Sequence, residues 1–252
     1  MDIVNDKKSF LIAPLVFLAC LAALLITWAV MDPTALHHAF DEDGYSPMEL
    51  ATLPFYAAII PLVWWKCPFT GSATRRRLLC TAVSCVAFMA IVKELDWHIT
   101  ALTACYPDVV ASFKGTPFKM RFLTKSVTGG ANSVAIPLGA KALVVAYFGL
   151  LFGVFAALLA YFFVPLMKGF FSLHPVAWTM CCFGSSGVMV QVMDRLPAWV
   201  RHAKELPKDK AIDATSSFFT AFEEGGELMI ALFALLAIVQ AHKYYTTHPD
   251  AD

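Results

Sequence analysis

The sequence contains the stretch LVVAYFGLLFGVFAALLAYFFV at residues 143–164, and none of these 22 residues is charged. A helix of roughly 20 apolar residues is needed to cross a hydrocarbon core about 30 Å thick. The stretch therefore predicts a transmembrane helix. It also carries Gly149 and Gly153 four residues apart, with Ala157 at the next step, and such a ridge of small residues lets a neighbouring helix pack closely.

The composition of the whole chain agrees with this prediction. Of the 252 residues, 59% are hydrophobic and 15% are charged. Soluble domains carry about 25% charged residues. The 19 basic and 19 acidic residues give no net charge, which indicates neither a nucleic-acid partner nor a polybasic membrane anchor. The seven cysteines form no CxxC motif and mostly fall in apolar runs, so we expect them to pack as small hydrophobic residues.

Apolar segments of this kind account for most of the chain. We therefore expect an all-α fold, an integral membrane helix bundle with six transmembrane helices, in a single domain over residues 1–252. The predicted spans are residues 10–31, 48–65, 78–98, 136–164, 175–194 and 214–241. The first is longer than a signal-peptide core and has no cleavage site after it, so we expect it to be retained. Between the third and fourth spans, residues 100–132 mix basic and aromatic side chains, which predicts an interfacial segment.

The start of the second span has a clear sequence signature. Ser46 is expected to cap the helix, Pro47 to take its first position and Glu49 to lie in its first turn. Residues 32–47 before it contain acids and no lysine or arginine, which is typical of an outer loop. His37 and His38 in this loop are interpreted as a solvated pair.

Charges near the membrane edges predict the orientation. Three consecutive arginines at residues 75–77, close to Trp64 and Trp65, are typical of a cytoplasmic edge. The amino and carboxyl termini are then both cytoplasmic, in the cell membrane or, in a Gram-negative organism, the inner membrane. A count of basic residues over all loops favours the opposite orientation, which stays open.

The sixth predicted span carries three carboxylates, Glu223, Glu224 and Glu227, around two glycines at residues 225–226. An ionised carboxylate in hydrocarbon is expensive, so it is expected to face other helices, water, a cation or a proton. Glu223 and Glu227 are four residues apart and would share one helix face. Because neighbouring like charges repel, we expect a proton, a cation or a basic side chain between them, and the candidate basic partners are Lys93, Lys141 and Arg121.

Ionisable residues at the ends of the other spans lie on the same predicted side of the membrane. Together with the three glutamates they predict an acidic and histidine-containing polar cavity in the outer half of the membrane. The candidate ion or proton site consists of Glu49, Glu94, Asp96, His98, Lys141, Asp194, Glu223, Glu224 and Glu227. Within it, Glu94 and His98 are four residues apart and are expected on one helix face.

Three functions fit this pattern. Exchangeable carboxylates favour binding or translocation of a cation or a proton, and the two glycines would allow a local break in the helix. Alternatively, the same groups fix helix register in a non-catalytic structural or assembly subunit of a membrane complex. A third reading is a membrane-embedded metal-dependent enzyme.

The enzyme reading would use Glu94, His98, Glu223 and Glu227 as metal ligands. Two-metal carboxylate bundles typically contain Glu-x-x-His pairs, whereas the spacing here is four and occurs once. No HExxH or GxSxG motif is present, so no catalytic residue is assigned and the pattern leans away from an enzyme. The cofactor is unknown, and the expected partners are the lipid bilayer and a protein partner in the membrane.

Overall fold

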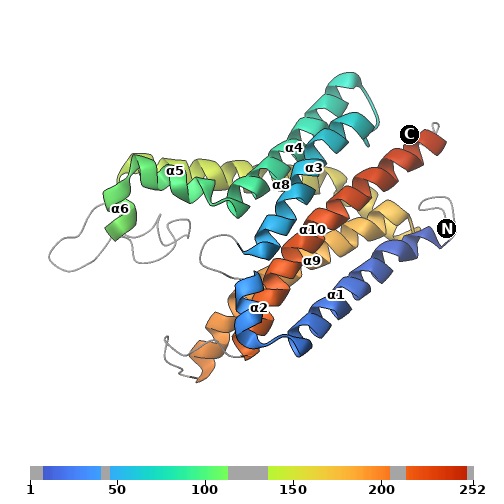
Figure 1. Cartoon of the computed structure of the whole chain (residues 1–252). Helices are drawn as coiled ribbons and strands as arrows, with labels where there is room; N and C mark the ends of the chain where they lie inside the picture. Colours follow the sequence, from blue (N-terminus) through green and yellow to red (C-terminus); the bar gives the residue numbers. More distant parts are fainter. Residues whose placement is uncertain (1–7, 41–45, 113–135, 205–213, 249–252) are drawn as a thin grey trace.

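The computed structural model describes residues 8–40, 46–112, 136–204 and 214–248, and every regular element within these ranges is a helix (Figure 1). The elements are η1 (Ser9–Leu11), α1 (Ile12–Val30), α2 (Pro33–Phe40), α3 (Pro47–Lys66), α4 (Ala73–Glu94), α5 (Trp97–Cys105), α6 (Pro107–Ser112), α8 (Leu138–Phe171), α9 (Pro175–Lys204) and α10 (Ala214–Thr247). The predicted all-helical fold is confirmed for these residues.

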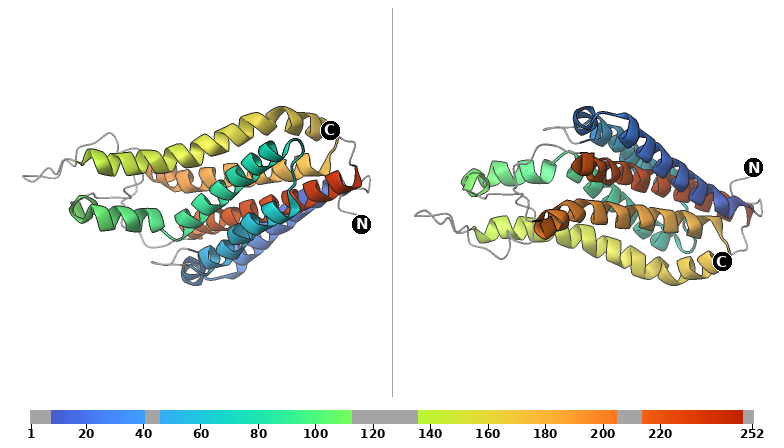
Figure 2. Two further views of the ribbon diagram at one scale, coloured as in Figure 1. Left: turned by 90° about the horizontal axis from the view of Figure 1, so that it is seen from above. Right: turned by 90° about the horizontal axis from the view of Figure 1, so that it is seen from below.

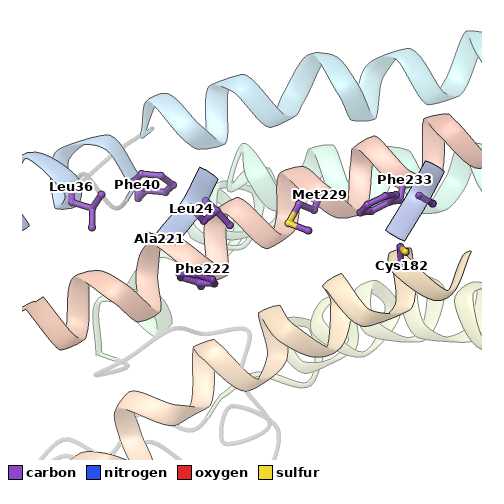
Figure 3. Packing of buried hydrophobic residues seen from close by; sticks show 9 residues of the cluster. Leu24, Leu36, Phe40, Cys182, Ala221, Phe222, Met229 and Phe233 are labelled. Carbon is purple, nitrogen blue, oxygen red and sulfur yellow. The ribbon is translucent and has the colours of Figure 1, made fainter. Parts of the chain in front are cut away.

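Helix α10 lies at the centre of the bundle and packs against α9, α3, α2 and α1. One of its faces meets α1, α2 and α9 in a buried apolar cluster, shown in Figure 3. The members from α10 are Ala221, Phe222, Met229 and Phe233. A second cluster joins α10 to α3 and α4 through residues that include Ile59, Val63, Ala87, Ala231 and Ile238. α10 is therefore enclosed on two sides. Polar side chains on an enclosed helix are expected to face partners on the neighbouring helices.

The long helices run alternately up and down. The start of α1 and the end of α10 lie at the same end of the bundle (Figures 1 and 2). The α3–α4 turn is also there, because Nδ1 of His242 lies 2.6 Å from the backbone oxygen of Lys66. The α8–α9 turn joins them, since the ring centroids of His174 and Tyr244 are 4.4 Å apart. The start of α3 and the end of α4 consequently lie at the opposite end.

Four helical segments are long and apolar enough to cross a membrane: Ser9–Val30, α3, α8 and Pro175–Pro197. A fifth is obtained if α4 and α5, which are bent by 69° where they meet, count as one span. Large apolar side chains are exposed along α1 and α8, for example Leu15, Leu18, Phe152 and Phe163. Exposed apolar surface of this extent fits a lipid environment. α10, which we predicted as the sixth span, is not among these helices in the described residues.

Several predicted boundaries differ from the structure. The third predicted span is not one helix over residues 78–98, because α4 ends at Glu94 and Asp96 takes a left-handed conformation with φ of 49°. The acidic loop at residues 32–47 contains helix α2, which begins at Pro33, a residue well suited to a first helical position. α9 continues to Lys204, ten residues beyond residue 194, where the fifth predicted span ends. Residues 113–135, which hold most of the predicted interfacial segment, lie outside the described residues.

The glycines have different roles from those predicted. α10 continues unbroken through residues 225–226, and these glycines instead allow close packing. A side chain at Gly225 would collide with Leu24 of α1, and a Cβ at Gly226 would lie 2.6 Å from Cγ2 of Val190 in α9. By contrast, a Cβ placed at Gly149 or Gly153 would have no atom of another described helix within 4 Å, so these two glycines have no partner helix within the described chain.

Candidate functional site

The first turn of α3 holds Glu49 in a capping box. The backbone N–H of Glu49 donates to Ser46 Oγ at 3.2 Å, and Glu49 Oε2 accepts from the Ser46 backbone N–H at 2.8 Å. These bonds satisfy two of the backbone N–H groups that a helix start leaves unpaired. The predicted start of the second span is confirmed. The Glu49 carboxylate is therefore committed to the backbone, although it also interacts electrostatically with Lys93 and Glu227.

The last turn of α4 ends in the pair Lys93–Glu94. A cation is favoured at this end of a helix, where the backbone carbonyls carry partial negative charge, whereas a carboxylate is disfavoured. The Glu94 side chain is nevertheless 3% exposed, while Lys93 is 52% exposed. The free-energy cost of burying the Glu94 carboxylate must therefore be offset by a partner other than the backbone of α4.

Helix α10 brings two further carboxylates to this position. Lys93 Nζ lies 2.5 Å and 2.6 Å from the two carboxylate oxygens of Glu227, and 3.3 Å from Glu94 Oε1. The Glu227 side chain is 8% exposed. One carboxylate oxygen from each of Glu94, Glu224 and Glu227 lies within 4.8 Å of the other two, and we call these three residues the acid cluster.

No known protein family matches this chain. Comparison with curated proteins and with solved structures likewise gives no significant match. The chemistry of the acid cluster must therefore be argued from its own residues.

The acid cluster is tied to α3 by a tyrosine that the sequence analysis did not select. Tyr56 Oη donates to the backbone carbonyl of Glu227 at 3.3 Å, in a buried setting. Tyr56 lies seven residues after Glu49, two helical turns along the same face of α3. The seven-residue spacing was the signal available in the sequence. The hydrogen bond of Tyr56 holds the segment of α10 that bears Glu227 against α3.

His98 does not share a helix face with Glu94. The chain turns at Asp96 between them, so the four-residue spacing does not act along one helix, and that part of the prediction is wrong. His98 Nδ1 lies 3.2 Å from the backbone oxygen of Val92, and its ring stacks on Tyr147 of α8 with centroids 4.9 Å apart. His98 is accordingly not part of the three-residue ligand group.

The other predicted residues lie around the acid cluster or away from it. Asp96 is exposed and forms the cap position of α5. Glu223 is half-buried and interacts electrostatically with Glu224, but contributes no oxygen to the group of three. Lys141 in the first turn of α8 and the exposed Asp194 of α9 form no ion pair in the part of the chain that the structure describes.

The acid cluster offers oxygen ligands and an excess of negative charge. If ionised, its three carboxylates carry three negative charges, against the single ammonium of Lys93. Burying like charges this close is costly unless a proton or a cation offsets them. Carboxylate oxygens are the ligands preferred by hard cations, such as calcium or magnesium, rather than by soft transition metals.

Proposed function

We propose that the protein is a multi-pass membrane protein that binds a proton or a hard cation at the acid cluster and translocates it. The observation that carries the proposal is the meeting of three carboxylates within 4.8 Å, two of them buried, against one lysine. An excess of buried negative charge attracts a proton or a cation. Ionisable groups inside membrane segments are uncommon and usually serve such a pathway.

The membrane placement extends the span assignment made above. We propose that α10 is the sixth transmembrane helix, because it packs along α9, to which it is antiparallel, and along α3, to which it is parallel. Glu227 is 13 residues from the start of α10, which is roughly 20 Å along the helix. With both termini cytoplasmic, in the cell membrane or, if the organism is Gram-negative, in its inner membrane, we place the acid cluster in the outer half of the bilayer. The lipid bilayer and a protein partner in the membrane are the proposed partners.

Lys93 has a specific place in this scheme. Its side chain is half exposed while its ammonium contacts buried oxygens of Glu227, so it connects the surface of the bundle with the acid cluster. An arriving cation competes with this ammonium for the same oxygens. An ion would thus enter most simply when the Lys93 side chain moves away from the acid cluster.

A second candidate is a structural or assembly role. The observation that favours it is the contact of Lys93 with both oxygens of Glu227, which neutralises that carboxylate and joins α4 to α10. In this role Glu94 and Glu224 keep their protons permanently, and no ion exchanges. The metal-dependent enzyme is less well supported, because His98 lies outside the ligand group and the remaining donors are all carboxylates.

Reconstituted vesicles distinguish these functions. Proton, sodium, potassium and calcium fluxes are measured under an imposed gradient for the wild type and for Glu224→Gln. The proposal predicts flux of at least one ion, reduced at least tenfold by Glu224→Gln. Glu223→Gln is the matched control, since it removes the same charge from the adjacent residue, outside the acid cluster, and should retain most of the flux. Wild-type vesicles that pass none of these ions would favour the structural role.

A further inference from the structure

A cavity of about 390 Å³ lies at the end of the bundle opposite the acid cluster. Its walls are the end of α3, the α3–α4 turn, the start of α4 and the last turns of α10. The lining residues that bear on its chemistry are Lys66, Arg76, His242, Tyr245, Thr246 and His248, and we call this cavity the basic pocket. Its volume is within the range of roughly 300 to 1,000 Å³ that small-molecule sites occupy.

The charge of the basic pocket is one-sided. Lys66 and Arg76 contribute two positive charges, and His242 and His248 add two imidazoles. None of the residues lining the pocket, within the described chain, is acidic. Since the whole sequence has no net charge, this is a local concentration of positive charge. A site of this kind selects an anion.

The walls of the basic pocket are held in place by the backbone. His242 Nδ1 is 2.6 Å from the backbone oxygen of Lys66, which can only accept, so the proton is on Nδ1 and α10 is fastened to the end of α3. The turn itself requires left-handed backbone at Cys67, with φ of 38°, and at Gly71, with φ of 99°. The pocket is therefore built by the ends of α3 and α10, the start of α4 and the short α3–α4 turn that these helix ends hold in place.

The position of the basic pocket indicates where its anion comes from. It adjoins the end of α3, where the Trp64 and Trp65 side chains are 48% and 78% exposed. Exposed tryptophans at a helix end mark the level of the lipid head groups. Lys66 Nζ lies 4.0 Å from the centre of the Trp65 ring, which places a lining ammonium at the same level. Basic pockets between membrane helices at this depth suit phosphate-bearing head groups.

We propose that the basic pocket binds the phosphate group of an anionic phospholipid. Lys66 and Arg76 neutralise the phosphate and donate charge-assisted hydrogen bonds to its oxygens. The same phosphate chemistry could be supplied by a soluble ion, and the lipid is favoured by the adjoining tryptophans. The site goes beyond the proposed ion pathway, shares no residue with the acid cluster and does not depend on the orientation in the membrane.

Lipid titration of the purified full chain tests this proposal. The protein in neutral detergent is titrated with phosphatidylglycerol or phosphatidylcholine, and bound lipid and thermal stability are measured. Phosphatidylglycerol should bind more tightly and raise the melting temperature. Arg76→Gln should weaken its binding about fivefold, the loss expected for one basic residue at a membrane surface. Arg76→Lys, which keeps the charge, should stay within about twofold of the wild type.

The matched control is Arg77→Gln, which removes the same charge from the neighbouring residue, one that does not line the basic pocket. It should change the affinity by less than about twofold. Equal losses for Arg76→Gln and Arg77→Gln would overturn the proposal, because they would show unspecific attraction to the basic surface. Equal stabilisation by inorganic phosphate would overturn the lipid as the source. Glu224→Gln should leave lipid binding unchanged, so the lipid site and the ion pathway can fail independently.

Discussion

Replacement of Lys93 by methionine is expected to destabilise the protein, because it removes the only ammonium that contacts the acid cluster in the described structure. Methionine keeps most of the length of the side chain and loses the charge. The change leaves Glu227, whose side chain is 8% exposed, without its partner at 2.5 Å and 2.6 Å. The structure therefore predicts the loss of two ion pairs, the closer one with Glu227 and the longer one with Glu94, with little change in packing.

The magnitude follows from the burial of the two partners. Breaking a fully buried ion pair typically costs 3–5 kcal/mol, and an exposed pair contributes about 1 kcal/mol or less. The Lys93 side chain is 52% exposed, so a value between these limits applies. We expect Lys93→Met to lower the free energy of unfolding by about 2–3 kcal/mol. Glu227→Gln should cost about 1 kcal/mol, because Lys93 keeps its contact with Glu94 and the amide can still accept a hydrogen bond.

Equilibrium unfolding in mixed detergent micelles, followed by circular dichroism, measures these differences. The double variant Lys93→Met/Glu227→Gln should be more stable than Lys93→Met alone, since it leaves no unpaired charge at residue 227, and less stable than Glu227→Gln alone, since it also loses the contact of Lys93 with Glu94. Lys141→Met is the matched control: this lysine forms no ion pair in the described structure, and its replacement should cost less than about 0.5 kcal/mol. If Lys93→Met and Lys141→Met lowered the free energy of unfolding by the same small amount, Lys93 would not offset the cost of burying the acid cluster.

Two further predictions concern polar groups away from the acid cluster. Gln240 is fully buried, and its Nε2 has no hydrogen-bond partner among the described residues, while its Oε1 accepts from Thr179 Oγ1. Gln240→Met should leave the free energy of unfolding unchanged or raise it in the same assay. Thr179→Val should lower it by about 1–3 kcal/mol, because Oε1 of Gln240 then has no donor either. A Gln240→Met variant less stable than Thr179→Val would refute this account of the hydrogen bonds of Gln240. Burial, with a smaller contribution from His248, lowers the pKa of His174 below its ordinary value of 6.5. The unfolded chain then takes up this proton before the folded protein does, so stability should fall as the pH drops through 6.5, and His174→Gln should flatten that dependence; an unchanged slope would contradict it.

The sequence was sufficient for the parts of the fold that depend on local chemistry. Uncharged runs such as residues 143–164 predicted helices because their length and polarity leave few alternatives. The start of α3 was predicted from Ser46, Pro47 and Glu49, because a capping box involves only neighbouring residues. Lys93 was one of three candidate partners for the glutamates of α10, together with Lys141 and Arg121, and the structure shows the contact of Lys93 with Glu227.

The predictions were wrong where the backbone departs from a continuous helix and where contacts between helices determine the role of a residue. Asp96 adopts a left-handed conformation, which separates Glu94 from His98 although their spacing suited one helix face. The glycines at residues 225–226 were interpreted as a possible break, yet α10 continues through them. Glycine is needed there because Leu24 and Val190 occupy the space that side chains would fill. Periodicity along one segment contains neither kind of information. For Tyr56, periodicity places the residue on the same face of α3 as Glu49, but it does not identify the partner on α10.

The central claim is that the acid cluster exchanges a proton or a cation, and infrared difference spectroscopy of the protein in membranes tests it most directly. Spectra are recorded as the pH or the cation is changed, for the wild type, Glu224→Gln and Glu223→Gln. The claim predicts a reversible carboxyl signal in the wild type that is lost or strongly reduced in Glu224→Gln and retained in Glu223→Gln. A wild-type spectrum with no carboxyl signal under any of these exchanges, or one that both variants leave intact, would contradict it.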